Sequence, residues 1–161
     1  MKLEERIRIL EANLDRQHTL SRAADGKIGP LLTLEMAMLG CLAALAPKGS
    51  TWSIPAAIST TLAAVSLAMS IGALLWAQVP RTEGPKGSVV FFGAITTRTV
   101  EQFHEAMRQL SAEEYLKSLA DQCHQNAEIT VRKFAWVHRG WILALVAVIP
   151  WVLAIYQLYR Q

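Results

Sequence analysis

The sequence predicts an all-α membrane protein with three transmembrane helices, an N-terminal amphipathic helix and a helical cytoplasmic segment between the second and third spans. Apolar residues are concentrated in three runs, 30–46, 54–79 and 141–159, whereas a soluble helical protein spreads them at helical period along every helix. The first run contains one charged residue and the other two contain none. Because roughly 17 to 25 apolar residues per helix cross a hydrocarbon core, each run is long enough to span a membrane.

The segment 1–27 has the pattern of an amphipathic helix. Its apolar residues recur at helical spacing, and charged residues occupy the other faces. The apolar positions are Leu3, Ile7, Leu10, Leu14 and Leu20. Such a helix packs against the protein's own cytoplasmic helices, or it lies at the membrane surface or on a partner helix. We expect a cytoplasmic helix here, and its apolar face is open to each of these interpretations.

A transmembrane hairpin is predicted for residues 28–79, with spans at about 29–46 and 54–79. The connection between the spans contains Pro47 and Gly49 and is too short to hold a domain. The second span is rich in Ala, Ser and Gly, which allow helices to approach closely. This composition suits assembly of several copies, and it is also common in monomeric hairpins.

Residues 80–139 form the predicted cytoplasmic segment, and 140–161 form the third transmembrane helix and its outer tip. Two prolines and two glycines within 80–87 exclude regular helix or strand there. A compact apolar patch follows at 89–93. The patch contacts a ligand, packs in a cytoplasmic core or enters the membrane interface.

Capping residues predict two helix starts in the cytoplasmic segment. Thr97 or Thr99 can cap a helix that ends near Leu110, and Ser111 with Glu114 has the spacing of a capping box. From Ser111 the chain contains no Pro or Gly before residue 140. We therefore expect one long helix that continues from the cytoplasm into the third span.

The distribution of basic residues predicts the orientation in the lipid bilayer. Six of the sixteen Lys and Arg residues precede the first span, and eight lie between the second and third spans. By the positive-inside rule, the N-terminus and residues 80–139 face the cytoplasm, and the C-terminus faces outside. The first span begins only after some thirty residues, so we expect it to act as its own insertion signal.

Motifs of enzyme and metal chemistry are absent from the sequence. It contains no glycine-rich phosphate loop and no nucleophile elbow, and its four His residues form no metal-ligand pattern with Cys or carboxylates. Cys41 lies within a span and Cys123 in the cytoplasmic helix, so no disulfide framework is implied. We expect no catalytic residue, no metal, no cofactor and no nucleic-acid partner.

A polar face of the predicted cytoplasmic helix is the first candidate site. Spacings of three, four and seven residues bring amide side chains and a cation together on one side of a helix. The residues are Gln122, Gln125, Asn126, Arg132 and Lys133. Amides and a cation together suit a ligand that has a base edge and a phosphate. The alternative is an ordinary solvated helix face.

The first span supplies a second candidate site, for a pore or for helix pairing. Glu35 lies within the apolar run, where a charged side chain facing lipid costs several kcal/mol. It faces a polar interior or another helix, or it lies near enough to the interface to stay hydrated. Asp25 and Lys27 lie at the mouth of the span, where Asp25 can cap the following helix and Lys27 can meet lipid phosphate.

Several motifs together resemble the transmembrane effectors of Pycsar, the bacterial pyrimidine-cyclase antiphage system. The resemblance covers about residues 20–158, with the motifs in the same order relative to three spans. The motifs are Ala24-Asp25-x-Lys27, Phe91-Phe92-Gly93, Ser111-x-Glu113-Glu114-Tyr115-Leu116, and the stretch from Leu119 to Arg139 with Gln122, Asn126, Ile129 and Arg132-Lys133-Phe134.

The resemblance implies a two-gene defence system in which a partner pyrimidine nucleotidyl cyclase makes cyclic CMP or cyclic UMP on phage infection. The effector then impairs the bacterial inner membrane, so that the infected cell stops growing or dies in an abortive infection. If the messenger binds directly, we expect it to bind between subunits of a homo-oligomer. The expected contacts are the Phe91, Phe92 and Gly93 turn and the polar face of the cytoplasmic helix.

The chain departs from the family pattern at two positions. Glu35 stands where the family usually has an uncharged residue, often Asn, and Ala94 stands where a His often follows the Phe-Phe-Gly block. Two other classes of function share the predicted topology. One is a non-signalling membrane scaffold or subunit whose cytoplasmic helices dock a protein partner, and the other is a constitutive holin-like pore.

Overall fold

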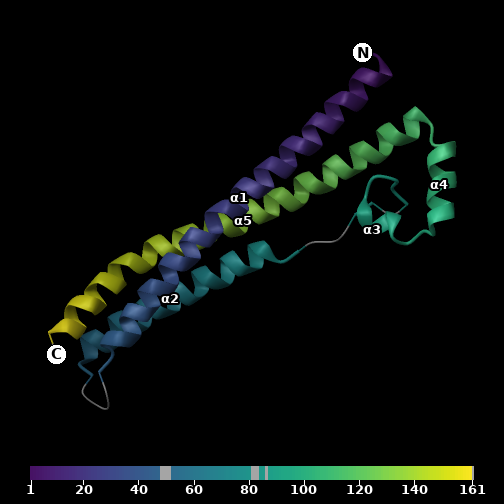
Figure 1. The fold of residues 1–161 in the computed structure, drawn as a ribbon. Helices are drawn as coiled ribbons and strands as arrows, with labels where there is room; N and C mark the ends of the chain where they lie inside the picture. The colour runs from purple at the N-terminus through teal and green to yellow at the C-terminus, as the bar shows by residue number, and fades with distance from the viewer. Residues whose placement is uncertain (48–51, 81–83, 86, 161) are drawn as a thin grey trace. The chain divides into compact units, whose positions relative to one another are not determined.

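A computed structural model describes residues 1–47, 52–80, 84–85 and 87–160 of the 161-residue chain (Figure 1). Within these residues the chain forms five helices and no strand. They are α1 (Leu3–Leu45), α2 (Ile54–Gln78), α3 (Phe92–Ile95), α4 (Val100–Gln109) and α5 (Ala112–Tyr159). Helices α1, α2 and α5 are long and apolar enough to cross a membrane. The predicted all-α fold with three spans is therefore confirmed.

Helix α1 is longer than the sequence predicts, because the N-terminal amphipathic helix and the first span form one continuous helix. Gly26 and Pro30 both lie inside it. Asp25 therefore lies within the helix, and the prediction that it caps the start of a new helix is wrong. A stripe of partly or fully buried residues, spaced alternately by four and three, runs along the whole helix and explains its continuity. The stripe consists of Leu3, Ile7, Leu10, Leu14, Gln17, Ser21, Ala24, Ile28, Leu31, Glu35, Met38 and Leu42.

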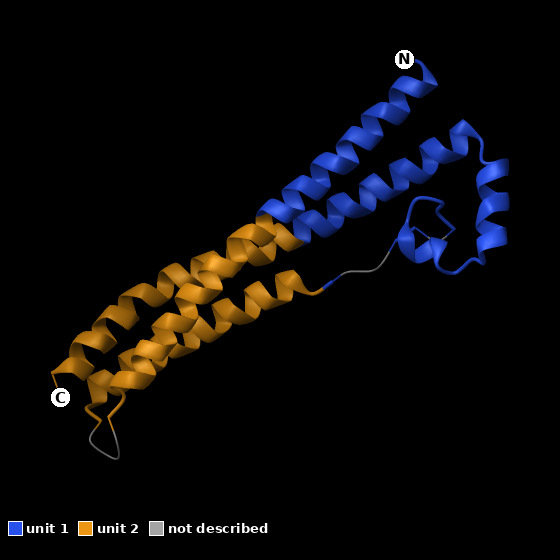
Figure 2. Ribbon diagram, in the orientation of Figure 1, with its two compact units in different colours: residues 1–23, 80–132 blue, residues 24–79, 133–161 orange. Residues whose placement is uncertain are grey.

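The chain divides into two compact units (Figure 2). Unit 1 comprises Met1–Ala23 and Pro80–Arg132, and unit 2 comprises Ala24–Val79 and Lys133–Gln161. Helices α1 and α5 each contribute residues to both units, whereas α2 belongs to unit 2, and α3 and α4 belong to unit 1. The predicted connections at 48–51 and 81–83 lie outside the described residues.

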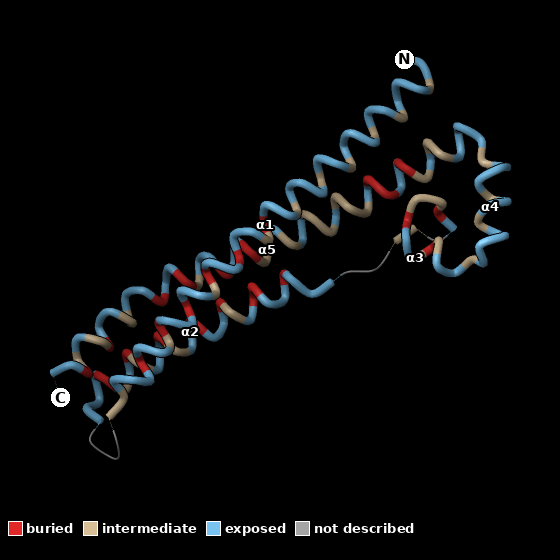
Figure 3. The backbone as a smooth tube through the Cα atoms, viewed as in Figure 1, coloured by how far each residue is buried: buried red, intermediate tan, exposed pale blue. Residues whose placement is uncertain are grey.

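Unit 2 consists of three helices whose buried residues form two core clusters, and Figure 3 shows buried positions along these helices in red. Small side chains recur every seventh residue on α2 and α5, at the period that keeps one helix face turned toward its neighbours. They are Ala56, Ala63, Ser70 and Ala77 on α2, and Gly140, Ala147 and Ala154 on α5. All seven are buried within a single copy of the chain. Close packing inside the chain thus accounts for much of the small-residue content of the second span, while assembly of several copies stays a prediction.

Direct polar contacts also join the helices of unit 2. The indole Nε1 of Trp151 donates to the carbonyl of Met38 at 2.9 Å, which links α5 to α1. Ser59 Oγ donates to Gln157 Oε1 at 3.0 Å, which links α2 to α5. Because an apolar interior offers no water partners, each contact pairs a polar side chain of one helix with a polar group of another.

Capping boxes precede α4 and α5, at Thr99, one of the two caps predicted for the first helix, and at Ser111, where the sequence predicts a capping box. Thr99 Oγ1 accepts from the backbone N–H of Gln102, whose side chain accepts from the backbone N–H of Thr99. Ser111 and Glu114 exchange the same pair of hydrogen bonds immediately before α5. These bonds hold the pKa of the Glu114 carboxyl below its usual value, since they favour its charged form.

The amphipathic half of α1 packs against α5 in unit 1, which favours internal packing over the other interpretations of its apolar face. The Tyr115 hydroxyl donates to Glu11 Oε1 at 2.9 Å, and the Cys123 thiol donates to the carbonyl of Leu10 at 3.3 Å. Burial raises the pKa of the Cys123 thiol. Leu20 was expected on this face but is 47% exposed, because it lies off the stripe that faces α5.

Candidate functional site

The loop before α3 is shaped by hydrogen bonds to Ser88. The hydroxyl of Ser88 accepts from the backbone N–H groups of Val90 and Phe91 at 3.1 and 3.2 Å. Arg98 donates to the carbonyl of Gly87 at 2.7 Å, and Gly87 adopts a φ of 76° that favours glycine. These hydrogen bonds hold the loop in a defined conformation immediately before Phe91 and Phe92.

Phe91 is seated between two glycines. A Cβ atom at Gly84 would lie 2.2 Å from the Phe91 ring, and a Cβ atom at Gly93 would lie 2.5 Å from it, so neither position has room for a side chain. Phe91 is 8% exposed and Phe92 is 61% exposed, with ring centroids 4.7 Å apart. Of the interpretations open for this patch, core packing therefore describes Phe91, while Phe92 presents an aromatic surface.

A pocket of about 320 Å³ in unit 1 brings together three segments of the chain. Its volume is at the lower end of the range for small-molecule sites. One wall comes from α1, a second from the Phe91 loop and α3, and a third from α5. The lining residues are Leu14, Gln17, His18, Ser21, Val90, Phe91, Phe92, Gln122, Asn126, Ile129 and Thr130.

Three buried amide atoms without a hydrogen-bond partner belong to residues that line this pocket. They are the oxygens Oε1 of Gln17 and Gln122 and the nitrogen Nδ2 of Asn126. Gln122 Nε2 donates to Asn126 Oδ1 at 3.3 Å, which leaves the other atom of each amide unused. Buried polar atoms in folded proteins are nearly always paired with protein groups, ordered water or a ligand, so these three residues mark the polar part of the pocket wall.

The amide pair offers one acceptor and one donor side by side, beside aromatic rings. A nucleobase has adjacent donor and acceptor atoms on its Watson–Crick edge and a flat face that stacks on aromatic groups. Both cytosine and uracil fit this pattern, since each has a donor next to an acceptor. If the oxygen and nitrogen atoms of both amides are exchanged, the pair still has one unused donor and one unused acceptor.

The charge at the pocket wall is compatible with a phosphodiester. Among the described lining residues there is no carboxylate, and His18 is the titratable side chain. Ser21 and Thr130 add hydroxyl groups to the same wall. The imidazole of His18 and these hydroxyl groups can act as hydrogen-bond donors to phosphodiester oxygens.

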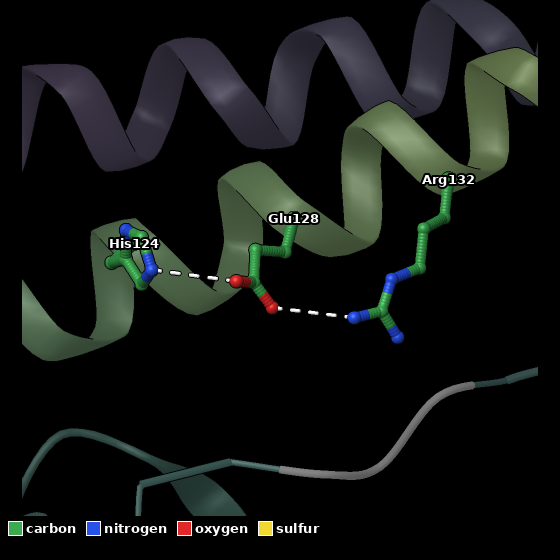
Figure 4. A network of polar contacts seen from close by, with 3 residues as sticks. All are labelled: His124, Glu128 and Arg132. Atoms are coloured by element: carbon green, nitrogen blue, oxygen red, sulfur yellow. Dashed lines mark hydrogen bonds and ion pairs between the residues drawn. The ribbon is translucent and has the colours of Figure 1, made fainter.

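The remaining residues of the predicted polar face lie elsewhere. Gln125 is absent from the pocket lining. Arg132 forms an ion pair with Glu128 at 3.4 Å, and Glu128 also contacts His124 at 3.4 Å, on an exposed face of α5 (Figure 4). Lys133 Nζ lies 2.6 Å from Asp25 Oδ2 in unit 2. The structure thus brings Phe91, Phe92, Gln122 and Asn126 together around the pocket. Gly93 leaves room for the Phe91 ring. The pocket lining does not include Gln125, Arg132 or Lys133.

The three candidate residues of the first span, Asp25, Lys27 and Glu35, lie in different environments. Lys27 is exposed, whereas Asp25 pairs with Lys133 between α1 and α5 of unit 2. Glu35 is fully buried in unit 2, where its carboxyl group contacts the Ser70 hydroxyl. Of the interpretations open for Glu35, pairing with another helix is therefore the one that describes its surroundings.

Sequence reasoning missed the contribution of α1 to the pocket. Gln17 and Ser21 lie on the same stripe as Leu14, three and seven residues further along. Polar residues that interrupt an apolar stripe are a usable signal, because a helix normally buries apolar side chains there. His18, the neighbour of Gln17, completes this wall.

The fold defines a class: a multi-pass α-helical membrane protein that carries a helical unit with its own polar pocket. Among the described residues, no group of three or more His, Cys, Asp or Glu could hold a metal ion. A family model, the Pycsar effector protein domain (PycTM), matches residues 9–159. The chain therefore belongs to the Pycsar effector family. No curated protein and no solved structure matches it.

Family membership makes this chain an antiphage effector with a functional link to a cyclase and a place in a membrane. It supports a non-enzymatic role for the protein. The resemblance that the sequence motifs indicate is thereby confirmed.

Proposed function

We infer that unit 1 binds a cyclic pyrimidine mononucleotide, cyclic CMP or cyclic UMP, and that binding leads the three membrane helices to impair the inner membrane. The observation that carries this proposal is the set of unpartnered amide atoms of Gln17, Gln122 and Asn126 around one pocket. The amides would pair with the base edge, Phe91 and Phe92 would contact its face, and His18 would meet the phosphodiester.

The shared helices supply a route from binding to the membrane. Residues of α1 and α5 line the pocket, and both helices continue into unit 2. A ligand shifts a conformational equilibrium only by its difference in affinity for the two states. We expect the bound state to be a homo-oligomer. We also expect the N-terminus to lie in the cytoplasm, which the distribution of Lys and Arg favours.

The test is the thermal stability of the detergent-purified full chain with cyclic CMP, cyclic UMP, cyclic AMP and cyclic GMP. At a ligand concentration about 100 times Kd, binding to the folded state stabilises by about 2.7 kcal/mol, which raises Tm by about 5–10 °C. We expect one pyrimidine nucleotide to give this shift selectively. Absence of a shift with all four nucleotides contradicts direct sensing and favours a scaffold that docks a protein partner.

Two variants on the same helix locate the site. Asn126→Ala removes the unpartnered donor and should reduce the nucleotide-dependent shift in Tm by about half or more, because the base edge loses a hydrogen bond. Gln125→Ala is the matched control, since Gln125 is an amide on α5 outside the pocket lining. Equal loss of binding in both variants contradicts the assignment of the pocket.

A further inference from the structure

A polar contact inside unit 2 joins all three membrane-spanning helices. Ser70 of α2 contacts Glu35 of α1 through Oε1, and the Ser70 hydroxyl lies 2.7 Å from the backbone carbonyl of Gly140 in α5. Glu35 and Ser70 are both 0% exposed. The second carboxyl oxygen of Glu35, Oε2, is buried and has no hydrogen-bond partner among the described residues.

Counting hydrogens assigns the protonation state of this contact. A serine hydroxyl carries one hydrogen, and a backbone carbonyl carries none. Ser70 makes two oxygen–oxygen contacts, so a second hydrogen is needed for both to be hydrogen bonds. Glu35 is the group in the cluster that can carry it. The arrangement that satisfies every contact is a Glu35 carboxylic acid donating to Ser70 Oγ, which in turn donates to the carbonyl of Gly140.

Burial leads to the same assignment. An ionised carboxylate removed from water needs a cation or several donors, and Glu35 has neither among the described contacts. The nearest ion pair on its helix is formed by Asp25 with Lys133, ten residues or about 15 Å away along α1.

Other charged groups face away from the cluster. On α1 the titratable neighbours are Lys27 and Cys41, which are both exposed. Helix α2 contains no titratable side chain within its bounds. On α5 the neighbours of Gly140 are His138 and Arg139, which are exposed, and Arg139 lies over the Trp136 ring at 4.7 Å.

We propose that Glu35 is a proton-binding site within the membrane-spanning unit, and that the bound proton joins α1, α2 and α5 through Ser70 and the carbonyl of Gly140. The proton comes from bulk water and adds to the carboxylate, so no other reactant is needed. The folded protein then holds a proton that the unfolded chain has released at neutral pH. Linkage requires the stability of the folded state to fall as the pH rises, by about tenfold per pH unit in the unfolding constant.

Infrared spectroscopy of the full chain in lipid vesicles tests the proton directly. At neutral pH the difference spectrum between wild type and Glu35→Gln should contain the carbonyl stretching band of a protonated carboxylic acid. Only carboxylate bands in that difference spectrum would overturn the proposal.

Thermal unfolding between about pH 6 and about pH 9 gives an independent readout. Wild type should lose several degrees of Tm across this range relative to Glu35→Gln, because the Gln amide donates to Ser70 at every pH. Ser59→Ala is the matched control, since Ser59 is a buried serine of α2 that bonds to α5 through the amide of Gln157. It should lower Tm and keep the wild-type pH slope. An equal pH slope in wild type and Glu35→Gln contradicts the proposal.

Discussion

The two units differ in how most of their buried polar groups are used, although Glu35 Oε2 in unit 2 is unpaired as well. In unit 2 the polar groups join helices to one another, as in the contacts of Trp151 with Met38 and of Ser59 with Gln157. In unit 1 the amides of Gln17, Gln122 and Asn126 leave atoms unpaired around a cavity. Satisfied contacts stabilise one arrangement, whereas unsatisfied ones cost stability until a ligand pairs with them. The difference supports the proposed function, in which unit 1 recognises the ligand and unit 2 is the scaffold in the membrane.

The largest effect should come from removing the ring that supports the pocket wall. Phe91→Ala deletes a buried side chain and should lower the stability of unit 1 by about 3–5 kcal/mol, since buried aromatic deletions leave a cavity. Hydrogen exchange should report the loss in the loop before α3 and leave the amides of α2 protected. Phe92→Ala is the control, because Phe92 is 61% exposed and its loss should change stability little. Similar effects of both variants would contradict the packing role of Phe91.

The next effect tests close packing in unit 2. A Cβ atom at Gly140 would lie 2.6 Å from the side chain of Leu74, which is 0% exposed, so this buried leucine would have to shift. Gly140→Ala should therefore lower stability by about 1–3 kcal/mol through overpacking. Gly72→Ala has open space and should leave Tm unchanged or raise it slightly in the same measurement, because Ala has the higher helix propensity. A neutral Gly140→Ala variant would show that α5 and α2 are less tightly packed than described.

A smaller effect concerns Lys133, which sequence reasoning placed with the ligand. Its side chain is 13% exposed and lies 2.6 Å from Asp25. Lys133→Ala should lower stability by about 1 kcal/mol, and a double-mutant cycle with Asp25→Ala should show coupling between the two. We expect the nucleotide-dependent shift in Tm to be retained. Loss of that shift at unchanged stability would restore Lys133 as a ligand contact.

The smallest effect is a pH dependence in unit 1. Burial, together with the hydrogen bond to the Glu11 carboxyl and its charge, raises the pKa of Tyr115 above its usual value of about 10. The phenol then stabilises the folded state at neutral pH, and this contribution is lost as the pH rises through the raised pKa. Tyr115→Phe should remove about 1 kcal/mol or less at neutral pH and flatten the alkaline loss of Tm. A steeper alkaline loss in the variant would contradict this assignment.

Much of the fold could be predicted from local signals. The three apolar runs give α1, α2 and α5, and the Thr99 and Ser111 capping boxes mark the starts of α4 and α5. The four-residue helix α3 was not predicted, because it depends on Ser88 and Arg98 bonding to the preceding loop. The continuity of α1 was missed because Gly26 and Pro30 usually end helices in isolation, and a stripe packed against other helices overrides that preference.

The candidate site was predictable in part. Gln122 and Asn126 share a helix face by their spacing of four, which is a local property. The same reasoning extends to Lys133, whose side chain on α5 is largely buried but lies against Asp25 in unit 2. Helical spacing does not predict which neighbouring element packs against each part of a long helix, because that depends on tertiary packing.

The column of small residues in unit 2 has a mechanical consequence. Large interlocked side chains fix two helices in one register, because sliding requires each side chain to leave its hole. Ala56 and Ala63 on α2 pack in one cluster with Ala147 and Ala154 on α5, and such small side chains interlock little. Shear by an ångström or two is a known mode of motion between packed helices. In unit 2 the bonds of Ser59 and Ser70 to α5, and the close fit of Leu74 against Gly140, therefore do more to fix the register of α2 against α5 than the small residues do.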